Sequence, residues 1–269
     1  MSDVVGVERK GQVVLITLNR PEARNAISPE MLVRLADAWT AVRDDPDIRV
    51  AVVTGAGDKA FCSGADLGRF IPLMSRARPP EDEWDRRLLA DGEMLGRGLL
   101  RTFDVVKPVI AAINGHAIAG GMELAQGTDL RVASESAKLG VQEVKWAIFP
   151  AGGSTVRLPR QIPYARAMEL LLTGDLITAA EALELGFLNR VVPQADVLPT
   201  ALDLAERIAA NGPIAVQAIR RSARACQGRP EAEAMQIESE MAAAVFRTED
   251  AQEGPLAFMQ KRKPVFQGR

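Results

Sequence analysis

Two glutamates in different sequence environments could carry acid–base chemistry. Glu123 follows a glycine-rich turn and lies in the first turn of a predicted helix. Alone, such an acid is most often a partner of the helix dipole, an interaction worth about 0.3–1 kcal/mol. Glu143 lies beside a predicted strand, where a polar residue needs no functional explanation. Two carboxyl groups with different surroundings can, however, divide general-acid and general-base work between them.

Two segments are suited to present backbone N–H groups to a ligand. Residues 60–67 contain the small residues Ser63, Gly64 and Ala65, followed by Asp66, which can cap a helix. Residues 114–124 run from a predicted strand through a glycine-rich turn into a helix. The first N–H groups of a helix have no acceptor within it. Two such donors directed at one point would form an oxyanion hole.

Other catalytic classes find little support in the sequence. Residues 55–60 fit a relaxed G-x-G-x-x-A dinucleotide pattern, but a helix should open there and the turn-rich residues 61–66 follow instead. We therefore expect a tight turn. No G-x-S-x-G elbow occurs, and the single histidine, His116, is expected to be a turn residue rather than a base. One histidine cannot form a paired-histidine site, so we expect no metal.

The charge and the cysteines exclude further classes. The chain has 33 basic and 35 acidic residues, a net charge of −2, and lacks the basic excess of a nucleic-acid-binding protein. The short basic clusters at residues 220–221 and 261–263 are expected to be solvated helix faces. Cys62 and Cys226 are the two cysteines, too few for a disulfide framework or a thiolate zinc cluster. They suit a reducing compartment.

No stretch of the sequence has the character of a membrane or targeting segment. The first residues lack the basic segment and apolar core of a signal peptide. The most apolar long stretch, residues 108–125, is interrupted by polar residues and glycines, whereas a spanning helix needs about 20 mainly apolar residues. We expect a cytoplasmic protein without a membrane span.

Most of the chain alternates strand and helix patterns. Residues 28–30 form a helix start with a serine cap, a proline in the first turn and an acid, and apolar residues at helical spacing follow to position 42. Strands separated by helices predict an α/β core with parallel pairing. The predicted strands are residues 4–8, 13–19, 49–54, 109–114, 129–133 and 188–192.

Two regions depart from that alternation. Residues 70–101 form an unusual region that is charged and irregular at residues 76–87, and we interpret it as a long surface excursion or lid. From residue 196 onward the pattern is helical throughout, which predicts a domain transition near residues 195–200. The predicted helices are residues 201–210, 214–225, 230–247 and 251–261.

Taken together, the motifs resemble those of the enoyl-CoA hydratase/isomerase (crotonase) family. The resemblance rests on segments in the order and spacing of that family, and it covers essentially the whole chain. Each motif alone is modestly specific, but all of them occur in register. The segments are residues 19–26, 60–67, 114–125, 142–143, 149–158 and 253–262.

The resemblance implies a fold, a domain division and an oxyanion hole. The fold is α/β, a crotonase-like spiral of ββα units with a C-terminal helical region. Residues 1–198 would form the spiral core with the acyl-CoA site, and residues 199–269 a helical oligomerisation region. The N–H groups of Ala65 and Gly120 would hold the thioester oxygen of an acyl-CoA, on which charge develops as an enolate forms.

The family resemblance also implies roles for individual side chains. Glu123 would act mainly on water, and Glu143 mainly as the proton donor to the α-carbon of a 2-enoyl-CoA. No metal or redox cofactor would be needed, since coenzyme A is part of the substrate. Residues expected to contact coenzyme A are Ala23, Arg24, Ser63, Ala65, Asp66 and Leu67, with Phe258 and Lys261 from a neighbouring subunit of a homotrimer or hexamer.

Three departures from the family pattern touch the water site and the coenzyme A contacts. Gln142 replaces a common proline, Gly68 replaces a common lysine, and residues 150–155 read Pro-Ala-Gly-Gly-Ser-Thr. Hydration remains the first interpretation because both glutamates are kept. The alternatives are an enoyl-CoA delta isomerase, in which one glutamate shuttles a proton, and another acyl-CoA lyase of the family. A noncatalytic acyl-CoA-binding protein on the same fold is a third.

Overall fold

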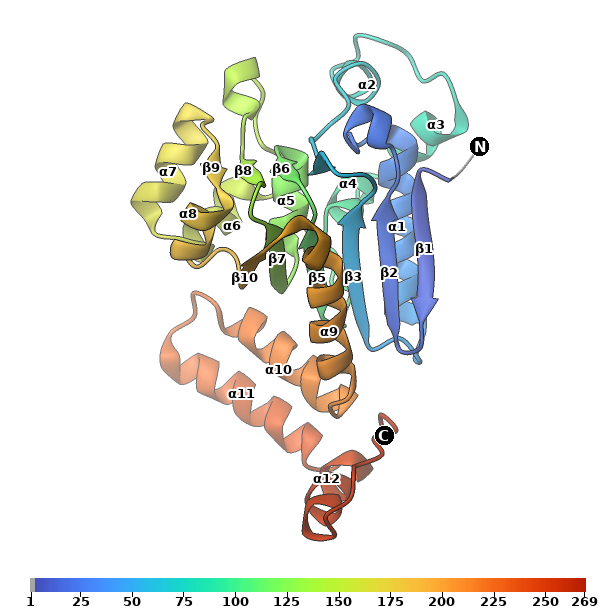
Figure 1. Ribbon diagram of the computed structural model, residues 1–269, viewed down its shortest axis with the longest axis vertical. Coiled ribbons are helices and arrows are strands. Elements are labelled where there is room, and N and C mark those ends of the chain that lie inside the picture. Colours follow the sequence, from blue (N-terminus) through green and yellow to red (C-terminus); the bar gives the residue numbers. More distant parts are fainter. Residues whose placement is uncertain (1–2) are drawn as a thin grey trace.

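The computed structural model describes residues 3–269, so Met1 and Ser2 of the N-terminal segment lie outside the described residues. Two β-sheets form the centre of the molecule (Figure 1). The larger sheet contains, in order, β1 (Val5–Lys10), β2 (Val13–Leu18), β3 (Val50–Gly55), β5 (Val109–Ile113), β7 (Leu130–Ser134) and β10 (Arg190–Val192). The smaller sheet contains β4 (Ala60–Cys62), β6 (His116–Ile118), β8 (Lys138–Gly140) and β9 (Ile177–Thr178).

The chain alternates between the two sheets in a repeating order. Strands β3, β5 and β7 of the larger sheet are each followed by a short strand of the smaller one, β4, β6 and β8, and then by helix. Neighbouring strands from β2 to β10 run parallel, whereas β1 and β2 form an antiparallel hairpin. The predicted ββα repeat and parallel core are therefore confirmed. The predicted strands of the larger sheet are found with their ends shifted by one or two residues.

Both faces of the larger sheet are covered at its centre, which explains why β3 and β5 are buried throughout. Alternate residues of β2 point to opposite sides, with Ile16 in the main core and Leu15 in a second apolar cluster. Helix α1 (Pro29–Asp44) covers the first side and begins as predicted, with the Ser28 hydroxyl accepting from the Met31 N–H at 3.2 Å. Helix α9 (Val197–Ala209) covers the second side through a stripe of small residues.

The expectation of irregular structure at residues 76–87 is confirmed for the loop up to residue 82 and is wrong from Glu83, where a helix begins. Residues 70–101 contain three short helices, α2 (Phe70–Met74), α3 (Glu83–Ala90) and α4 (Met94–Gly98), and α3 and α4 pack against α1. Asp85 is fully buried and accepts from Arg78 and from the Glu81 N–H. The Arg78 guanidinium lowers the pKa of Asp85 to about 2. The Arg78–Asp85 pair, which the charge pattern did not indicate, holds the loop before α3 in place, whereas Arg76 and Arg86 are exposed.

Helices complete the remaining connections of the core. They are α5 (Gly120–Gly127), α6 (Ser154–Gln161), α7 (Tyr164–Thr173) and α8 (Ala179–Glu184), with 3-10 turns η1 (Pro21–Ala23), η2 (Glu143–Trp146) and η3 (Gln194–Asp196). Within residues 3–269, no helix combines the length and apolar character needed to cross a membrane.

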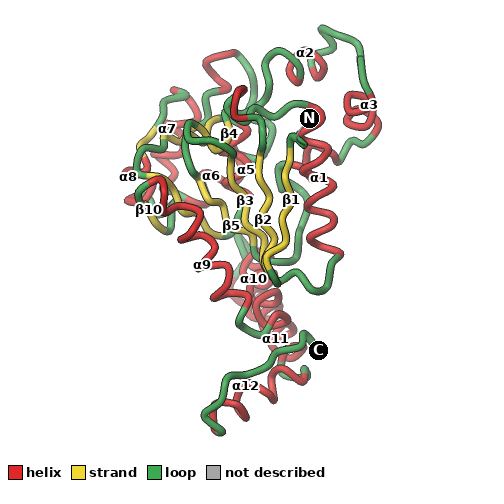
Figure 2. Tube along the Cα trace, turned by 45° about the vertical axis from the view of Figure 1, so that its right-hand side comes forward, coloured by secondary structure: helices red, strands yellow, loops and turns green. Residues whose placement is uncertain are grey.

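The last three helices form an arm that projects from the core (Figures 1 and 2). This C-terminal arm contains α10 (Pro213–Cys226), α11 (Glu231–Val245) and α12 (Glu249–Met259), and α11 packs on α10. The end of the chain returns toward the sheet, where the Arg49 guanidinium donates to the Phe266 carbonyl at 2.6 Å. The expected division after residue 198 falls within α9, which packs on the sheet, and it stays a prediction.

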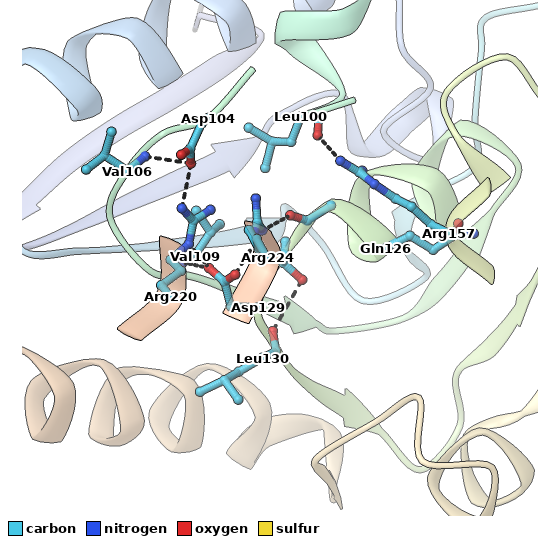
Figure 3. Close-up of polar contacts among 12 residues, drawn as sticks. Leu100, Asp104, Val106, Val109, Gln126, Asp129, Leu130, Arg157, Arg220 and Arg224 are labelled. Atoms are coloured by element: carbon cyan, nitrogen blue, oxygen red, sulfur yellow. Dashed lines mark hydrogen bonds and ion pairs between the residues drawn. The ribbon is translucent and has the colours of Figure 1, made fainter. Parts of the chain in front are cut away.

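Arg220 corrects the expectation of a solvated basic face at residues 220–221. Its side chain is buried and donates to Asp129 at 2.8 Å and to Asp104 at 2.5 Å (Figure 3). Asp129 also accepts from Arg224 at 2.8 Å and from the Val109 N–H at 2.8 Å. This cluster joins α10 to the starts of β5 and β7, whereas Arg221 is exposed. The pattern of charges could not show that a partner lay across the fold.

Candidate active site

Two loops from successive ββα units meet at the start of α5. Gly64 has φ +95°, and a Cβ there would lie 2.7 Å from the Ala119 Cβ and 3.2 Å from the Gly120 nitrogen. Such a contact leaves no room for a side chain, and the backbone conformation also favours glycine. Hydrogen bonds to both neighbours of Ala65 fix the first loop: the Ile27 N–H donates to Gly64 O, and the Asp66 N–H donates to Ile27 O.

The N–H groups of Ala65 and Gly120 border the same small space. A Cβ on Gly120 would lie 3.7 Å from the Ala65 nitrogen. Within residues 3–269, neither N–H has a hydrogen-bond acceptor. Two unpaired donors beside one space are what an oxyanion hole requires.

Ala119 sets the direction of the Gly120 N–H. It has φ 54° and ψ −124°, a conformation that L-residues rarely adopt. Its N–H donates to Gly140 O at 2.8 Å, and its carbonyl accepts from the Glu123 N–H at 2.9 Å. The fold therefore holds a strained residue at the entrance to α5, as happens at functional sites. The glycine-rich motif marked this turn, but the sequence did not identify Ala119 as its strained residue.

Glu123 is buried on α5 and held by the start of α6. The Ser154 N–H donates to its Oε1 at 3.2 Å, and the exposed fraction of Glu123 is 3%. Burial raises the pKa of Glu123, whereas donors from Ser154, Gly152 and Gly153 oppose the rise. A Cβ on Gly152 would lie 2.4 Å from the Glu123 Oε2, so only glycine permits this approach. The glycine run at residues 152–153 of the motif thus permits this approach, a role that the sequence did not indicate.

Glu143 has a different environment from Glu123. It opens η2 and is half-buried, and its Oε2 is buried without a hydrogen-bond partner among the described residues. Burial raises the pKa of Glu143 to about 7, and the charge of Glu123 acts in the same direction. Near neutral pH, Glu143 can therefore carry a proton. Its Oε2 has no hydrogen-bond partner among the described residues to take that proton.

The residue before Glu143 helps to hold η2. The Gln142 side chain donates to the Gly174 carbonyl at 3.3 Å, and Lys145 forms an ion pair with Asp175 at 2.9 Å. These contacts tie η2 to the end of α7. The amide thus supplies a contact that a proline at position 142 could not make.

The structure brings together the N-terminal residues expected to contact coenzyme A. The Ser63 N–H donates to Arg24 O at 3.1 Å, and Ala23 ends the adjacent turn η1. Asp66 caps the following residues through the Gly68 and Arg69 N–H groups, and Leu67 is 57% exposed. These residues therefore lie along one stretch that continues to the unpaired Ala65 N–H.

Two supporting residues in this stretch were not identified from the sequence. Arg20 forms an ion pair with Asp66 at 3.0 Å. Asn25 is fully buried, and its side chain donates to the carbonyls of Ala56 and Ala60 and accepts from the Arg20 N–H. Both residues belong to the family motif at residues 19–26, and that motif is the sequence signal that could have identified them.

Phe258 and Lys261 are not part of this grouping within one chain. Phe258 is 86% exposed on α12, and Lys261 follows that helix. The end of the arm lies far from α5 in Figure 1, and α12 remains away from the core in Figure 2. A contribution from a neighbouring subunit stays a prediction.

The G-x-G-x-x-A pattern at residues 55–60 and the single histidine, His116, have structural roles. Residues 56–59 form the predicted tight turn between β3 and β4, so a strand rather than a helix follows. His116 begins β6 instead of lying in a turn, so that prediction is wrong. Its Nδ1 accepts from the Lys138 N–H at 3.1 Å and thereby joins β6 to β8.

Comparison with characterised sequences gives a consistent picture. The family described as enoyl-CoA hydratase/isomerase matches residues 8–269. Enoyl-CoA hydratase EchA19 of Mycobacterium tuberculosis is 50% identical over 263 residues, 98% of this chain and 96% of the relative. The (E)-benzylidenesuccinyl-CoA hydratase of Thauera aromatica is 42% identical over 265 residues, 98% of this chain and 99% of the relative.

Solved structures agree with the sequence comparison. An enoyl-CoA hydratase from Mycobacterium tuberculosis superimposes with a TM-score of 0.88 at 37% identity and covers 100% of both chains. One from Bacillus anthracis has a TM-score of 0.88 at 38% identity and covers 98% of this chain and 99% of that chain. The crotonase-like α/β fold expected from the motifs is confirmed, and the chain belongs to the enoyl-CoA hydratase/isomerase family of enzymes.

Proposed function

We propose that this protein is an enoyl-CoA hydratase that adds water across the 2,3 double bond of a 2-enoyl-CoA thioester. The observation that carries the proposal is the pairing of two glutamates in different environments with two unpaired N–H groups. Burial raises the pKa of Glu123, and the N–H donors that hold it limit the rise because they favour its charged form. Burial and the charge of Glu123 favour the protonated form of Glu143. One base and one acid are what hydration needs.

In the proposed reaction, Glu123 accepts a proton from water as the water oxygen bonds to the β-carbon. The π electrons of the double bond move toward the thioester oxygen, where the N–H groups of Ala65 and Gly120 stabilise the enolate. Glu143 then donates its proton to the α-carbon. Exchange of protons with solvent returns both glutamates to their starting states. Because charge on the thioester oxygen grows along this path, donors placed there lower the barrier.

The rest of the proposed site binds coenzyme A as part of the substrate, and the reaction calls for no metal or redox cofactor. Ala23, Arg24 and Ser63 would contact it together with Asp66 and Leu67. Phe258 and Lys261 would come from a neighbouring subunit, in keeping with their exposure on the arm. A cytoplasmic location stays a prediction.

An isomerase remains the alternative within the family, together with other acyl-CoA lyases. Isomerisation needs one glutamate to move a proton between two carbons. The raised pKa of Glu143 and its unpartnered Oε2 favour a second working acid, and therefore hydration. A noncatalytic acyl-CoA-binding protein would have no use for two such acids beside unpaired N–H groups.

The central test is hydration of crotonyl-CoA by the Glu123→Gln and Glu143→Gln variants. Each is expected to lower turnover at least about a hundredfold, because a positioned acid or base supplies roughly 10²–10⁴ in rate. Loss of the enoyl absorbance measures the reaction. Glu135→Gln, at an exposed acid after β7, is the matched control and should retain activity. Near-normal turnover in either folded site variant would remove that residue from the mechanism.

The pH dependence of kcat/KM should report both glutamates. The reaction needs Glu143 protonated, so the rate should fall as pH rises through about 7. It also needs Glu123 ionised, so a second fall is expected on the acidic side. In Glu143→Gln, the residual rate should lose the fall above neutrality. A wild-type profile that is flat between about pH 6 and about pH 9 would contradict these assignments.

Gly120→Val should abolish hydration while leaving the fold intact. A Cβ at this position meets no atom closer than 3.4 Å, yet it enters the space beside the Ala65 N–H. A valine side chain there would keep the thioester oxygen away from both donors, and loss of even one oxyanion donor typically lowers turnover about 10²–10³-fold. Turnover and thermal melting are measured together.

Gly121→Ala provides the contrast, because its Cβ would lie 2.2 Å from Cys62 O and should lower the melting temperature. If the activity of Gly120→Val falls only with its folded fraction, Gly120 is a packing glycine and does not serve the oxyanion hole.

We also propose that the C-terminal arm assembles the protein into a trimer or a dimer of trimers. Its large apolar side chains include Ile219, 70% exposed, and Phe246, 79% exposed. Apolar surface of this kind on a projecting arm marks an interaction site. Light scattering should give three or six times the 29.0 kDa chain mass.

Phe246→Asp should shift the assembly toward smaller species. Val7→Asp, at an exposed valine of β1, is the control and should not. A 29.0 kDa wild-type species at micromolar concentration would refute the assembly.

A further inference from the structure

One arginine of α6 lies against the last turn of α5, the helix that carries Glu123. A Cβ on Gly127, the final residue of α5, would lie 2.9 Å from the Nη1 of Arg157. Glu123 and Gly127 are four residues apart and therefore share one face of the helix. Because residue 127 has no side chain, the Arg157 guanidinium occupies the position that such a side chain would take.

The glycine run before α6 brings the same two charged groups to neighbouring residues. A Cβ on Gly152 would lie 2.4 Å from the Glu123 Oε2, and a Cβ on Gly153 would lie 3.9 Å from the Arg157 Nε. Two separate contacts, one at the end of α5 and one before α6, thus place Arg157 beside Glu123.

Backbone carbonyls hold the Arg157 guanidinium in this position. Its Nη2 donates to the Leu100 carbonyl (Figure 3) and, at 3.1 Å, to the Arg101 carbonyl. Its Nη1 is buried and has no hydrogen-bond partner among residues 3–269. Carbonyl groups do not neutralise a guanidinium, and a buried charge is screened little by solvent and salt. The charge of Arg157 can therefore act on its neighbours.

Charged groups from several elements act on Arg157 in turn. Burial lowers the pKa of Arg157 to about 10, and the charges of Arg224 and Arg101 act in the same direction. The charges of Glu123 and Asp129 act in the opposite direction. Arg157 is thus still charged near neutral pH. Since attraction between two charges is mutual, Arg157 favours the ionised form of Glu123.

We propose that Arg157 is a positioning residue for the proposed base, supplying the positive charge that keeps Glu123 ionised in its buried site. The inference rests on the proposed hydration, in which ionised Glu123 takes a proton from water. Burial opposes that ionisation, and so does the nearby carboxyl of Glu143 whenever it is charged. A cation held by other groups favours the charge of Glu123 without occupying its oxygens.

The pH dependence of crotonyl-CoA hydration by Arg157→Gln tests this role. Glutamine removes the charge but keeps an N–H donor for the carbonyls at residues 100 and 101. The pKa of Glu123 should then rise, so the fall of kcat/KM on the acidic side should move to higher pH by about half a unit or more. A purely structural role predicts no such move. Loosening the site would admit water and shift the fall to lower pH, because burial is what raises the pKa of Glu123.

Arg157→Lys and Arg160→Gln are the controls. Lysine keeps the charge but loses the forked geometry, so its acidic fall should remain at the wild-type pH even where turnover is lower. Arg160 is exposed on the same helix and donates to the Val156 carbonyl, so Arg160→Gln should match wild type. If thermal melting shows that Arg157→Gln does not fold, Gly127→Ala replaces it. Its Cβ would displace the Arg157 Nη1 and should move the acidic fall to higher pH.

A ¹³C NMR titration of the glutamate side-chain carboxyls makes the same comparison without substrate. The Glu123 signal is identified by its absence from the spectrum of Glu123→Gln. A failure of hydration and a failure of this inference are therefore distinguishable. The inference is overturned if the pKa of Glu123 does not rise when the charge at position 157 is removed or displaced in a folded protein, or if it rises equally in Arg157→Lys.

Discussion

The contact between Gly64 and the Ala119–Gly120 turn is the constraint on which the site depends. The two loops belong to different ββα units, and their N–H groups can border one space only if the backbones touch. That contact demands glycine at position 64, where φ is +95° and a Cβ would collide with Ala119. It also demands that Ala119 hold a positive φ at the entrance to α5. Hydrogen bonds from Ile27, Asp66 and Ala119 keep both loops in place, so the unpaired donors need no rearrangement to meet a ligand.

Contacts between distant elements also set the environments of the two acids. Glu123 is one turn into α5 and meets the first residues of α6, whose N–H groups stabilise its charge. Glu143 lies on a short turn after β8, close enough to feel the charge of Glu123 but with an oxygen that no described group satisfies. Burial acts on both carboxyls, and the difference in their hydrogen bonds separates them. Their proposed division into base and acid follows from that difference.

Charge also joins the arm to the core. Asp129, just before β7, forms ion pairs with Arg220 and Arg224 of α10. The Val109 N–H at the start of β5 donates to the same carboxylate. The arm is thus anchored at its first helix, and its later helices are left with exposed apolar faces. Arg157 lies to one side of this anchor, on the helix α6 whose first N–H holds Glu123 (Figure 3).

The sequence by itself determined the local elements and the family. The Ser28 cap and the apolar spacing after it predicted α1, and the apolar runs predicted the strands of the larger sheet, because caps and periodicity act over a few residues. It also identified Glu123, Glu143 and the two loops as candidates, because the motifs occur together and in order.

The tertiary structure alone decided what distant residues do to one another. The three-residue strands β4, β6 and β8 exist through pairing with each other, since runs so short carry no periodicity of their own. Asp85 and Arg220 read as solvated charges, yet both are buried against partners that the sequence could not place. The raised pKa of Glu143 likewise depends on burial and on a second carboxylate from another element. Burial, pairing and charge coupling arise only when the chain brings remote segments into contact, and no local pattern encodes them.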